Sequence, residues 1–188
     1  FDPEQSISFK IVFLGESAVG KTTFIYQLLE KQYKDYIEPT LGASFQNYMV
    51  KINEKNVMLE IWDTAGQEKY RAVAPAYYRG AKGVVFMFDL TSPESFEKVK
   101  SWIKQVSETA VDNAVFCLLG NKCDMEHDDI SSIEEYLKQE QKFMYQKVSA
   151  KSGENVEKVI IQIAQKLLNN FGDSQKKVIK VGEHQNKK

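Results

Sequence analysis

A glycine-bounded loop near the amino terminus has the spacing of a phosphate-binding loop. Residues 15–22 (GESAVGKT) fit the pattern GxxxxGK(S/T) and lie between a strand-like apolar run and a helical pattern. In such a loop, backbone N–H groups and the helix N-terminus surround phosphate oxygens. Lys21 is expected to reach the outer phosphates, and Thr22 to offer its hydroxyl to Mg²⁺. The loop predicts a nucleoside polyphosphate but leaves the base open, because ATPases, kinases and GTPases all use it.

The residues that select the base follow two later strand-like runs. Residues 120–124 (GNKCD) come directly after an apolar run, so their side chains emerge at the carboxyl end of a sheet strand. The Asp124 carboxylate can accept hydrogen bonds from guanine N1–H and the 2-amino group, and adenine has neither group. Residues 149–151 (SAK) follow another predicted strand, where a backbone N–H can meet guanine O6. The two segments together predict a guanine nucleotide.

Two further segments carry residues suited to the terminal phosphate and its metal ion. Asp63 ends a strand and suits Mg²⁺ through water, and Gly66 offers a flexible N–H to the terminal phosphate. Gln67 can orient a water molecule for in-line attack, and the Thr40 hydroxyl can reach Mg²⁺ when a third phosphate is present. Both segments can act as loops that change with the nucleotide. The Tyr33 ring can stack on the edge of the base or belong to the core.

The predicted site combines three kinds of residue. The catalytic residues are Gln67 and Lys21, and the metal ligands are Thr22, Thr40 and Asp63. The nucleotide-binding residues are Ser17, Ala18, Val19, Gly20, Lys21, Thr22, Thr23, Tyr33, Thr40, Gly66, Asn121, Lys122, Asp124, Ser149, Ala150 and Lys151.

The elements that must position these residues alternate between strand and helix. Strands are predicted at residues 8–14, 43–52, 57–62, 83–88, 114–119 and 143–148. Helices are predicted at residues 21–32, from Ser92 and Pro93 onward, at 131–139 and at 155–168, and residues 53–56 are predicted as a hairpin turn. This order predicts an α/β fold with a six-stranded, mostly parallel sheet, one antiparallel edge strand and helices on both faces.

Composition narrows the class of protein. The 188 residues suit one domain with an appended tail, and 25 basic against 26 acidic residues leave a net charge of −1. This balanced charge gives no global electrostatic field that would favour nucleic acid, so we expect no nucleic-acid partner. We also expect a monomer. Two cysteines suit a reducing compartment, and the cytoplasm is the expected location. We divide the chain into an N-terminal extension (residues 1–7), a nucleotide-binding domain (8–170) and a basic flexible tail (171–188).

The motifs together resemble those of Ras-superfamily small GTPases, and within them the Rab family. Three stretches carry the Rab resemblance: residues 39–45 (PTLGASF), 60–68 (EIWDTAGQE) and 77–81 (YYRGA). Residues 16–19 (ESAV) and 74–78 (APAYY) are similar to the endocytic, early-endosomal branch of Rabs.

The resemblance implies a P-loop G domain that binds GTP and GDP with Mg²⁺ and hydrolyses GTP slowly without a GTPase-activating protein. It also implies a guanine nucleotide exchange factor, GTP-dependent effectors and a role in vesicle traffic, with the protein cycling between cytoplasm and endosomal membranes. Rabs reach membranes through lipidated C-terminal cysteines, whereas this chain ends in Asn186, Lys187 and Lys188. The acidic stretch at residues 125–148 also departs from the Rab pattern but contains no predicted ligand.

Two other functions compete with a GTP-driven switch. A nucleotide-bound interaction scaffold without turnover is opposed by the presence of Gln67, Thr40 and Gly66. An ATPase or nucleoside kinase is opposed by Asp124, because that carboxylate selects guanine.

Overall fold

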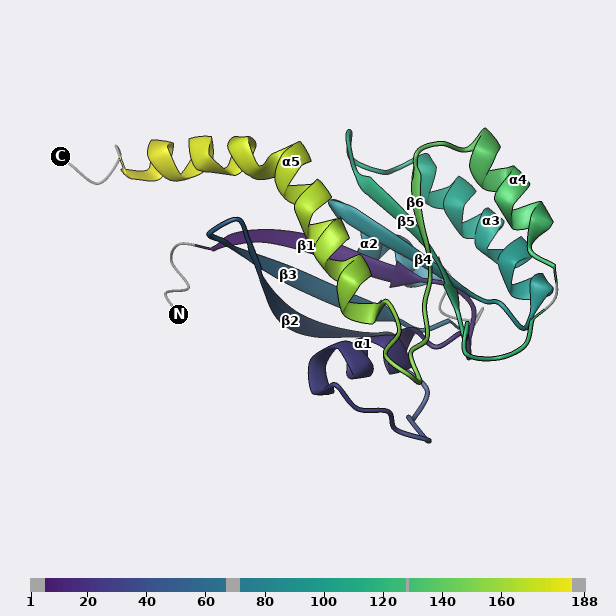
Figure 1. Cartoon of the computed structure of the whole chain (residues 1–188). Coiled ribbons are helices and arrows are strands. Elements are labelled where there is room, and N and C mark those ends of the chain that lie inside the picture. Colours follow the sequence, from purple (N-terminus) through teal and green to yellow (C-terminus); the bar gives the residue numbers. More distant parts are fainter. Residues whose placement is uncertain (1–5, 67–71, 128, 184–188) are drawn as a thin grey trace.

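One sheet forms the centre of the molecule (Figure 1). The computed structural model describes residues 6–66, 72–127 and 129–183, without the side chains of residues 173–183. The strands are β1 (Ile7–Leu14), β2 (Ala43–Ile52), β3 (Lys55–Thr64), β4 (Gly83–Asp89), β5 (Val115–Asn121) and β6 (Phe143–Lys147). They lie in the order β2-β3-β1-β4-β5-β6, with β2 antiparallel to β3 and the other neighbours parallel. The predicted sheet, with its single antiparallel edge strand, is confirmed.

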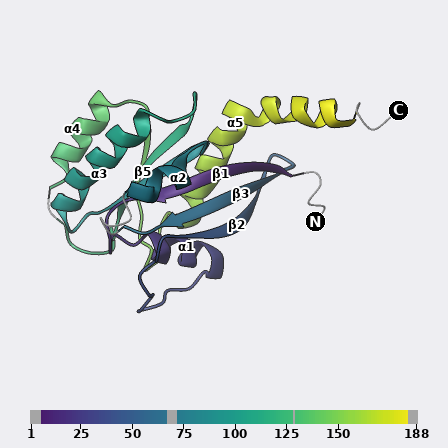
Figure 2. The ribbon, with the colours of Figure 1, turned by 180° about the vertical axis from the view of Figure 1, so that it is seen from behind.

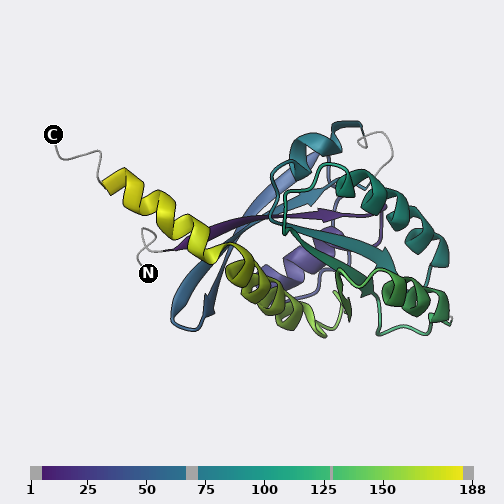
Figure 3. The same ribbon diagram turned by 90° about the horizontal axis from the view of Figure 1, so that it is seen from above.

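Helices cover both faces of this sheet, as the views from behind and from above show (Figures 2 and 3). They are α1 (Lys21–Glu30), α2 (Ala74–Tyr78), α3 (Pro93–Ser107), α4 (Ser131–Gln139) and α5 (Val156–Glu183). The buried apolar residues of α1 and α5 share one core cluster, and those of α2, α3 and α4 share a second cluster on the opposite face.

Strand β1 shows how the sequence builds both cores. Its alternate residues Ile11 and Phe13 belong to the cluster with α1 and α5, while Val12 and Leu14 belong to the other cluster. All four are fully buried. A central parallel strand has to be apolar on both sides because helices cover both faces. The continuous apolar run therefore fixes β1 in the middle of the sheet, where its carboxyl end leads into the glycine-bounded loop.

Two local features differ from the sequence prediction. The hairpin turn contains only Asn53 and Glu54, with Ile52 opposite Lys55, so β3 begins two residues earlier than expected. Both turn residues have left-handed φ angles, 45° and 66°, as tight two-residue hairpins require. The short helix α2, with a proline in its first turn, is absent from the prediction because five residues are too few to show helical periodicity.

Helix α5 is longer than predicted. The prediction that it ends near Leu168 is wrong, since the helix runs to Glu183 and extends into the segment assigned to a flexible tail. The apolar repeat stops earlier, but residues such as Gln and Lys favour helix without needing burial. The extended part projects away from the sheet (Figures 1 and 3). In the described part of the chain, no helix combines the length and apolar character needed to cross a membrane.

Candidate functional site

The predicted site residues gather at one edge of the sheet. Residues 15–20 connect β1 to α1, residues 120–124 include the end of β5, and residues 149–151 follow β6. Because these strands are parallel, their carboxyl ends meet at the same edge. Two adjoining cavities lie there, which we call the phosphate cavity and the base cavity.

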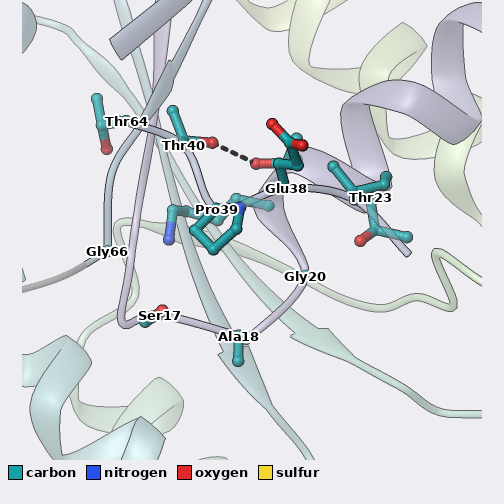
Figure 4. Close-up of a pocket in the computed structure, with 12 residues that line it drawn as sticks. Ser17, Ala18, Gly20, Thr23, Glu38, Pro39, Thr40, Thr64 and Gly66 are labelled. Carbon is teal, nitrogen blue, oxygen red and sulfur yellow. Dashed lines mark hydrogen bonds between the residues drawn. The ribbon is translucent and has the colours of Figure 1, made fainter. Parts of the chain in front are cut away.

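The phosphate cavity lies between the loop after β1 and the segment before β2 (Figure 4). It is lined by Ser17, Ala18, Gly20, Lys21, Thr22, Thr23, Ile37, Glu38, Pro39, Thr40, Thr64 and Gly66. Gly20 has a left-handed φ of 99°, and a Cβ atom there would overlap the side-chain amide of Asn121. Glycine is therefore required where the loop turns into α1.

Lys21 spans the loop from the first residue of α1. Its Nζ donates hydrogen bonds to the carbonyl oxygens of Gly15 (2.9 Å) and Glu16 (2.8 Å), and the residue is only 5% exposed. Burial lowers the pKa of Lys21 to about 8, although the charges of Asp63 and Glu16 act in the opposite direction. Lys21 also lines the phosphate cavity, where its positive charge can offset the negative charge of phosphate oxygens.

The three predicted metal ligands lie in direct contact. Thr22 Oγ1 lies 2.8 Å from Thr40 Oγ1, and Asp63 Oδ2 accepts hydrogen bonds from Thr22 (2.6 Å) and Thr40 (3.2 Å). Asp63 Oδ1 is buried with no hydrogen-bond partner among the described residues. Burial raises the pKa of Asp63, against the hydrogen bond from Thr22, the charge of Lys21 and the hydrogen bond from Thr40.

This oxygen cluster fits Mg²⁺. Within the described ranges no group of three His, Cys, Asp or Glu side chains gathers to hold a metal. Mg²⁺ needs no such cage, because it usually keeps several waters and takes one or two protein oxygens together with substrate phosphates. One buried carboxylate with an unpartnered oxygen, beside two hydroxyls and a phosphate cavity, has the composition of such a site.

The residues expected at the terminal phosphate lie close to the loop after β1. The backbone of Gly66 approaches that of Glu16 and Ser17 so closely that a Cβ atom on Gly66 would overlap it. Ala65 N–H donates to the carbonyl oxygen of Gly42 (2.8 Å), so the segments that carry Thr40 and Gly66 are joined. Gln67, the predicted catalytic residue, lies outside the described residues.

The base cavity adjoins the phosphate cavity. Its lining consists of Ala18, Gly20, Thr23, Tyr33, Asn121, Lys122, Asp124, Met125, Ala150 and Lys151. Tyr33 is 41% exposed, and Lys151 Nζ lies 5.9 Å from the centre of its ring. Of the two positions left open for Tyr33, the structure supports the base cavity and not the core.

Hydrogen bonds between side chain and loop hold the base cavity in shape. Ser149 Oγ donates to Asp124 Oδ1 at 2.5 Å, which fixes the carboxylate predicted to read guanine. Asn121 Nδ2 donates to the Val19 carbonyl oxygen (2.8 Å), and Ala150 N–H donates to Asn121 Oδ1 (3.0 Å). Asn121 thus ties the end of β5 to two loops, the one after β1 and the one after β6, and the Val19 side chain is buried in the core. Sequence spacing indicated these residues but not these bracing roles.

Comparison with known proteins decides the family. The model of the Ras family matches residues 10–169. The chain belongs to the Ras family. Ras-family proteins are GTP-binding switches that in general use Mg²⁺ with the nucleotide and hydrolyse GTP. Proteins of this family generally interact with exchange factors, GTPase-activating proteins and effectors.

A further feature of this Ras-family protein is a cluster of three aromatic side chains from β2, β3 and α2, which we call the aromatic surface. Phe45 on β2 and Trp62 on β3 stack edge to face with ring centres 5.3 Å apart, and Tyr77 on α2 lies 6.0 Å from Trp62. Phe45 is 45% exposed. Thr40 lies just before β2, and Asp63 lies on β3 directly after Trp62. A conformational change in the segments that carry them would therefore alter the aromatic surface.

One contact at this Ras-family site involves a residue that the sequence prediction missed. Asp89, the last residue of β4, pairs with Lys122 at 2.5 Å. A charged residue ending an otherwise apolar strand, beside the strand that carries Asn121, is the signal that points to it.

Proposed function

We propose that this protein is a Rab-type GTPase that binds GTP in its two adjoining cavities and regulates endocytic membrane traffic when it is in the GTP-bound state. The observation that carries the proposal is the contact among Thr22, Thr40 and Asp63. This contact joins α1, the helix after the phosphate loop, to the segment before β2 that carries Thr40 and to the end of β3 that carries Asp63. We call these two the switch segments. A ligand that engages these oxygens changes the conformation of both segments at once.

In this proposal the chain's own residues divide the work. Lys21 and the backbone of residues 15–20 bind the phosphates, and Asp124 reads the base. Thr22, Thr40 and Asp63 would hold Mg²⁺, which offsets charge on the outer phosphates when bound. Gln67 orients the attacking water. Catalysis then rests on positioning and electrostatic stabilisation, as in other phosphoryl transfers.

The Rab and endocytic assignments rest on sequence motifs and on the aromatic surface. Residues 39–45 and 60–68 match Rab-like stretches, and their strands carry Phe45 and Trp62 on the surface beside the switch segments. Residues 16–19 support the endocytic branch. We propose that effectors bind this surface in the GTP state, and that the protein cycles between cytoplasm and endosomal membranes through a lipidated C-terminus.

Replacing the base-reading carboxylate tests the nucleotide assignment. Asp124→Asn should lower GDP affinity by about 100-fold or more, because two hydrogen bonds to a charged acceptor are lost. The same variant should gain affinity for xanthosine diphosphate, whose 2-oxo group can accept from an amide. Asp112→Asn, an exposed carboxylate elsewhere on the surface, serves as the matched control. Unchanged GDP affinity in Asp124→Asn, measured by calorimetry, would refute the assignment.

The cellular role needs a separate experiment. Cells expressing the tagged full-length protein would be given a brief pulse of fluorescent dextran, and overlap of the tag with dextran-containing vesicles would be scored. We expect overlap for Gln67→Leu and a diffuse signal for Thr22→Asn. A tag that stays away from dextran in every variant would contradict the endocytic proposal without touching the nucleotide assignment.

A further inference from the structure

Lys122 forms one wall of the base cavity from a strained backbone position. It follows directly after β5 and has a left-handed φ of 67°, which few residues other than glycine adopt readily. Its side chain has four rotatable bonds and is 34% exposed. Without a partner, such a side chain would sample many positions across the mouth of the cavity.

Asp89 supplies that partner. Lys122 Nζ lies 2.5 Å from Asp89 Oδ2, and the Asp89 side chain is only 10% exposed. The other carboxylate oxygen, Oδ1, accepts hydrogen bonds from Thr91 N–H (2.8 Å) and Thr91 Oγ1 (2.7 Å). Burial acts to raise the pKa of Asp89, but the hydrogen bonds from Lys122 and Thr91 and the Lys122 charge outweigh it, so the pKa lies below its ordinary value. The carboxylate is ionised at neutral pH with both oxygens engaged.

The backbone that carries Asp89 is also held. Asp89 lies opposite Asn121 in the β4–β5 register, and Leu90 N–H donates to the Asn121 carbonyl oxygen (3.0 Å). Asp89 N–H donates to Ser95 Oγ (2.9 Å), which ties the strand end to α3. Asp89 is therefore held by β5, by α3 and by Thr91. Because its carboxylate is fixed in this way, the fold also sets the position of the Lys122 ammonium group that pairs with it.

Asp89 acts at a distance from the ligand. It lines a different cavity, between β4 and the N-terminal ends of α3 and α4, whereas Lys122 lines the base cavity. The Asp89 carboxylate contacts the lining of the base cavity through Lys122.

We propose that Asp89 is a positioning residue for nucleotide binding: it holds the Lys122 side chain as a fixed wall of the base cavity before the nucleotide arrives. Preorganisation of this kind increases affinity because less side-chain freedom is lost on binding. The effect should appear mainly in the dissociation rate. The proposal rests on the assignment of the base cavity to guanine.

The test measures dissociation of a fluorescent GDP analogue from the full chain in the presence of Mg²⁺. Asp89→Asn keeps the shape of the side chain but removes its charge, and we expect dissociation to become about tenfold faster. Lys122→Met keeps the stem of the side chain and should have an effect at least as large. The double variant should be no faster than Lys122→Met alone, because the two residues act as one unit. Asp129→Asn, an exposed carboxylate that contacts Ser131 at the start of α4, is the matched control and should leave the rate unchanged.

A purely structural role for Asp89 gives a different result. In that case Asp89→Asn would lower the melting temperature, and its effect on the dissociation rate would add to the effect of Lys122→Met. Additive effects on the dissociation rate would overturn the proposal. An unchanged dissociation rate in Asp89→Asn also overturns it. Should Asp89→Asn fail to fold, Thr91→Val removes one hydrogen bond to the same carboxylate and should speed dissociation about twofold; no change there is equally decisive.

Asp124→Asn in the same assay separates this proposal from the one it rests on. If Asp124→Asn releases GDP faster and Asp89→Asn does not, only the positioning role fails. If Asp124→Asn has no effect, the base assignment itself is wrong.

Discussion

Thr22 and Asp63 lie 41 residues apart in the sequence, yet Thr22 Oγ1 donates a 2.6 Å hydrogen bond to Asp63 Oδ2. The Thr40 hydroxyl lies within hydrogen-bond distance of both. The first helix, the segment before β2 and the end of β3 therefore share one cluster of oxygens. We therefore expect the conformation of the two segments that carry Thr40 and Asp63 to depend on what binds at Thr22.

Replacing Thr22 tests this dependence. Thr22→Asn should weaken GTP binding at least tenfold more than GDP binding, because Mg²⁺ held by Thr22 would offset the charge of the outer phosphates and the amide is a poorer ligand for Mg²⁺. Calorimetry with each nucleotide in Mg²⁺ buffer measures the difference. Thr22→Ser retains the hydroxyl and should keep the native preference. Equal loss of both nucleotides in Thr22→Asn would mean that Thr22 is only structural.

The sequence predicts the sheet, and for physical reasons it also predicts that most of the candidate site residues lie together. Buried parallel strands are continuous apolar runs, and parallel topology brings residues such as Lys21 and Asp124 to one edge of the sheet. The pairing of Asp89 with Lys122 is harder to predict, because it depends on which strands are neighbours and on the backbone angle at residue 122. Apolar periodicity does not predict the carboxyl-terminal half of α5, because helical hydrogen bonds can continue where that periodicity stops.

Adjacent isoleucines on α5 test how this helix packs. Ile160 is fully buried in the core cluster with β1, whereas Ile161 is 41% exposed. Ile160→Ala should lower the free energy of unfolding by about 3 kcal/mol, through lost burial and the cavity that remains. Ile161→Ala makes the same chemical change on the exposed side and should cost less than about 1 kcal/mol. Urea denaturation of GDP-saturated protein gives both values; similar costs would contradict the described orientation of α5.

The two cysteines should differ in their response to pH. Cys117 is fully buried, and burial raises its pKa from 9.0 to about 12. Cys123 is half-buried, and its pKa is raised by burial and by the neighbouring acidic groups of Glu154 and Asp124. Thiol reagents attack the thiolate, so labelling of Cys123 at pH 7.5 should be slow and should accelerate as pH rises. Cys117 should be labelled only after denaturation.

Mass spectrometry of the labelled peptides measures this difference, and a Cys123→Ala variant should remain unlabelled while folded. Labelling of Cys117 in the native protein at pH 7.5 would show that this part of the core opens.

The raised pKa of Cys117 also links stability to pH. Above pH 9.0 the unfolded thiol loses its proton while the folded one keeps it until about pH 12, so stability should fall as pH rises through this window.

Gln67 lies beyond the described residues, but its place directly after Gly66 gives the last prediction. Gln67→Leu should slow single-turnover GTP hydrolysis by roughly 10- to 100-fold, because leucine keeps the bulk of the side chain but cannot orient the attacking water. GDP and GTP affinities should stay within about twofold of the native values, since the nucleotide contacts lie elsewhere. Trapped GTP should then hold the segments of Thr40 and Gly66 in one state, together with the aromatic surface around Trp62.

The same variant distinguishes a switch from a scaffold that never turns over. A partner can report the switch only if it binds the two nucleotide states with different affinities. Effectors should therefore be retained by immobilised Gln67→Leu protein and lost from Thr22→Asn protein. If native protein shows no hydrolysis in a single-turnover assay, and its partners bind the GDP and GTP-analogue forms with equal Kd, the scaffold explains the site better. Hydrolysis that is slow in native protein and slower still in Gln67→Leu supports a switch, because only turnover returns the two segments to the GDP state.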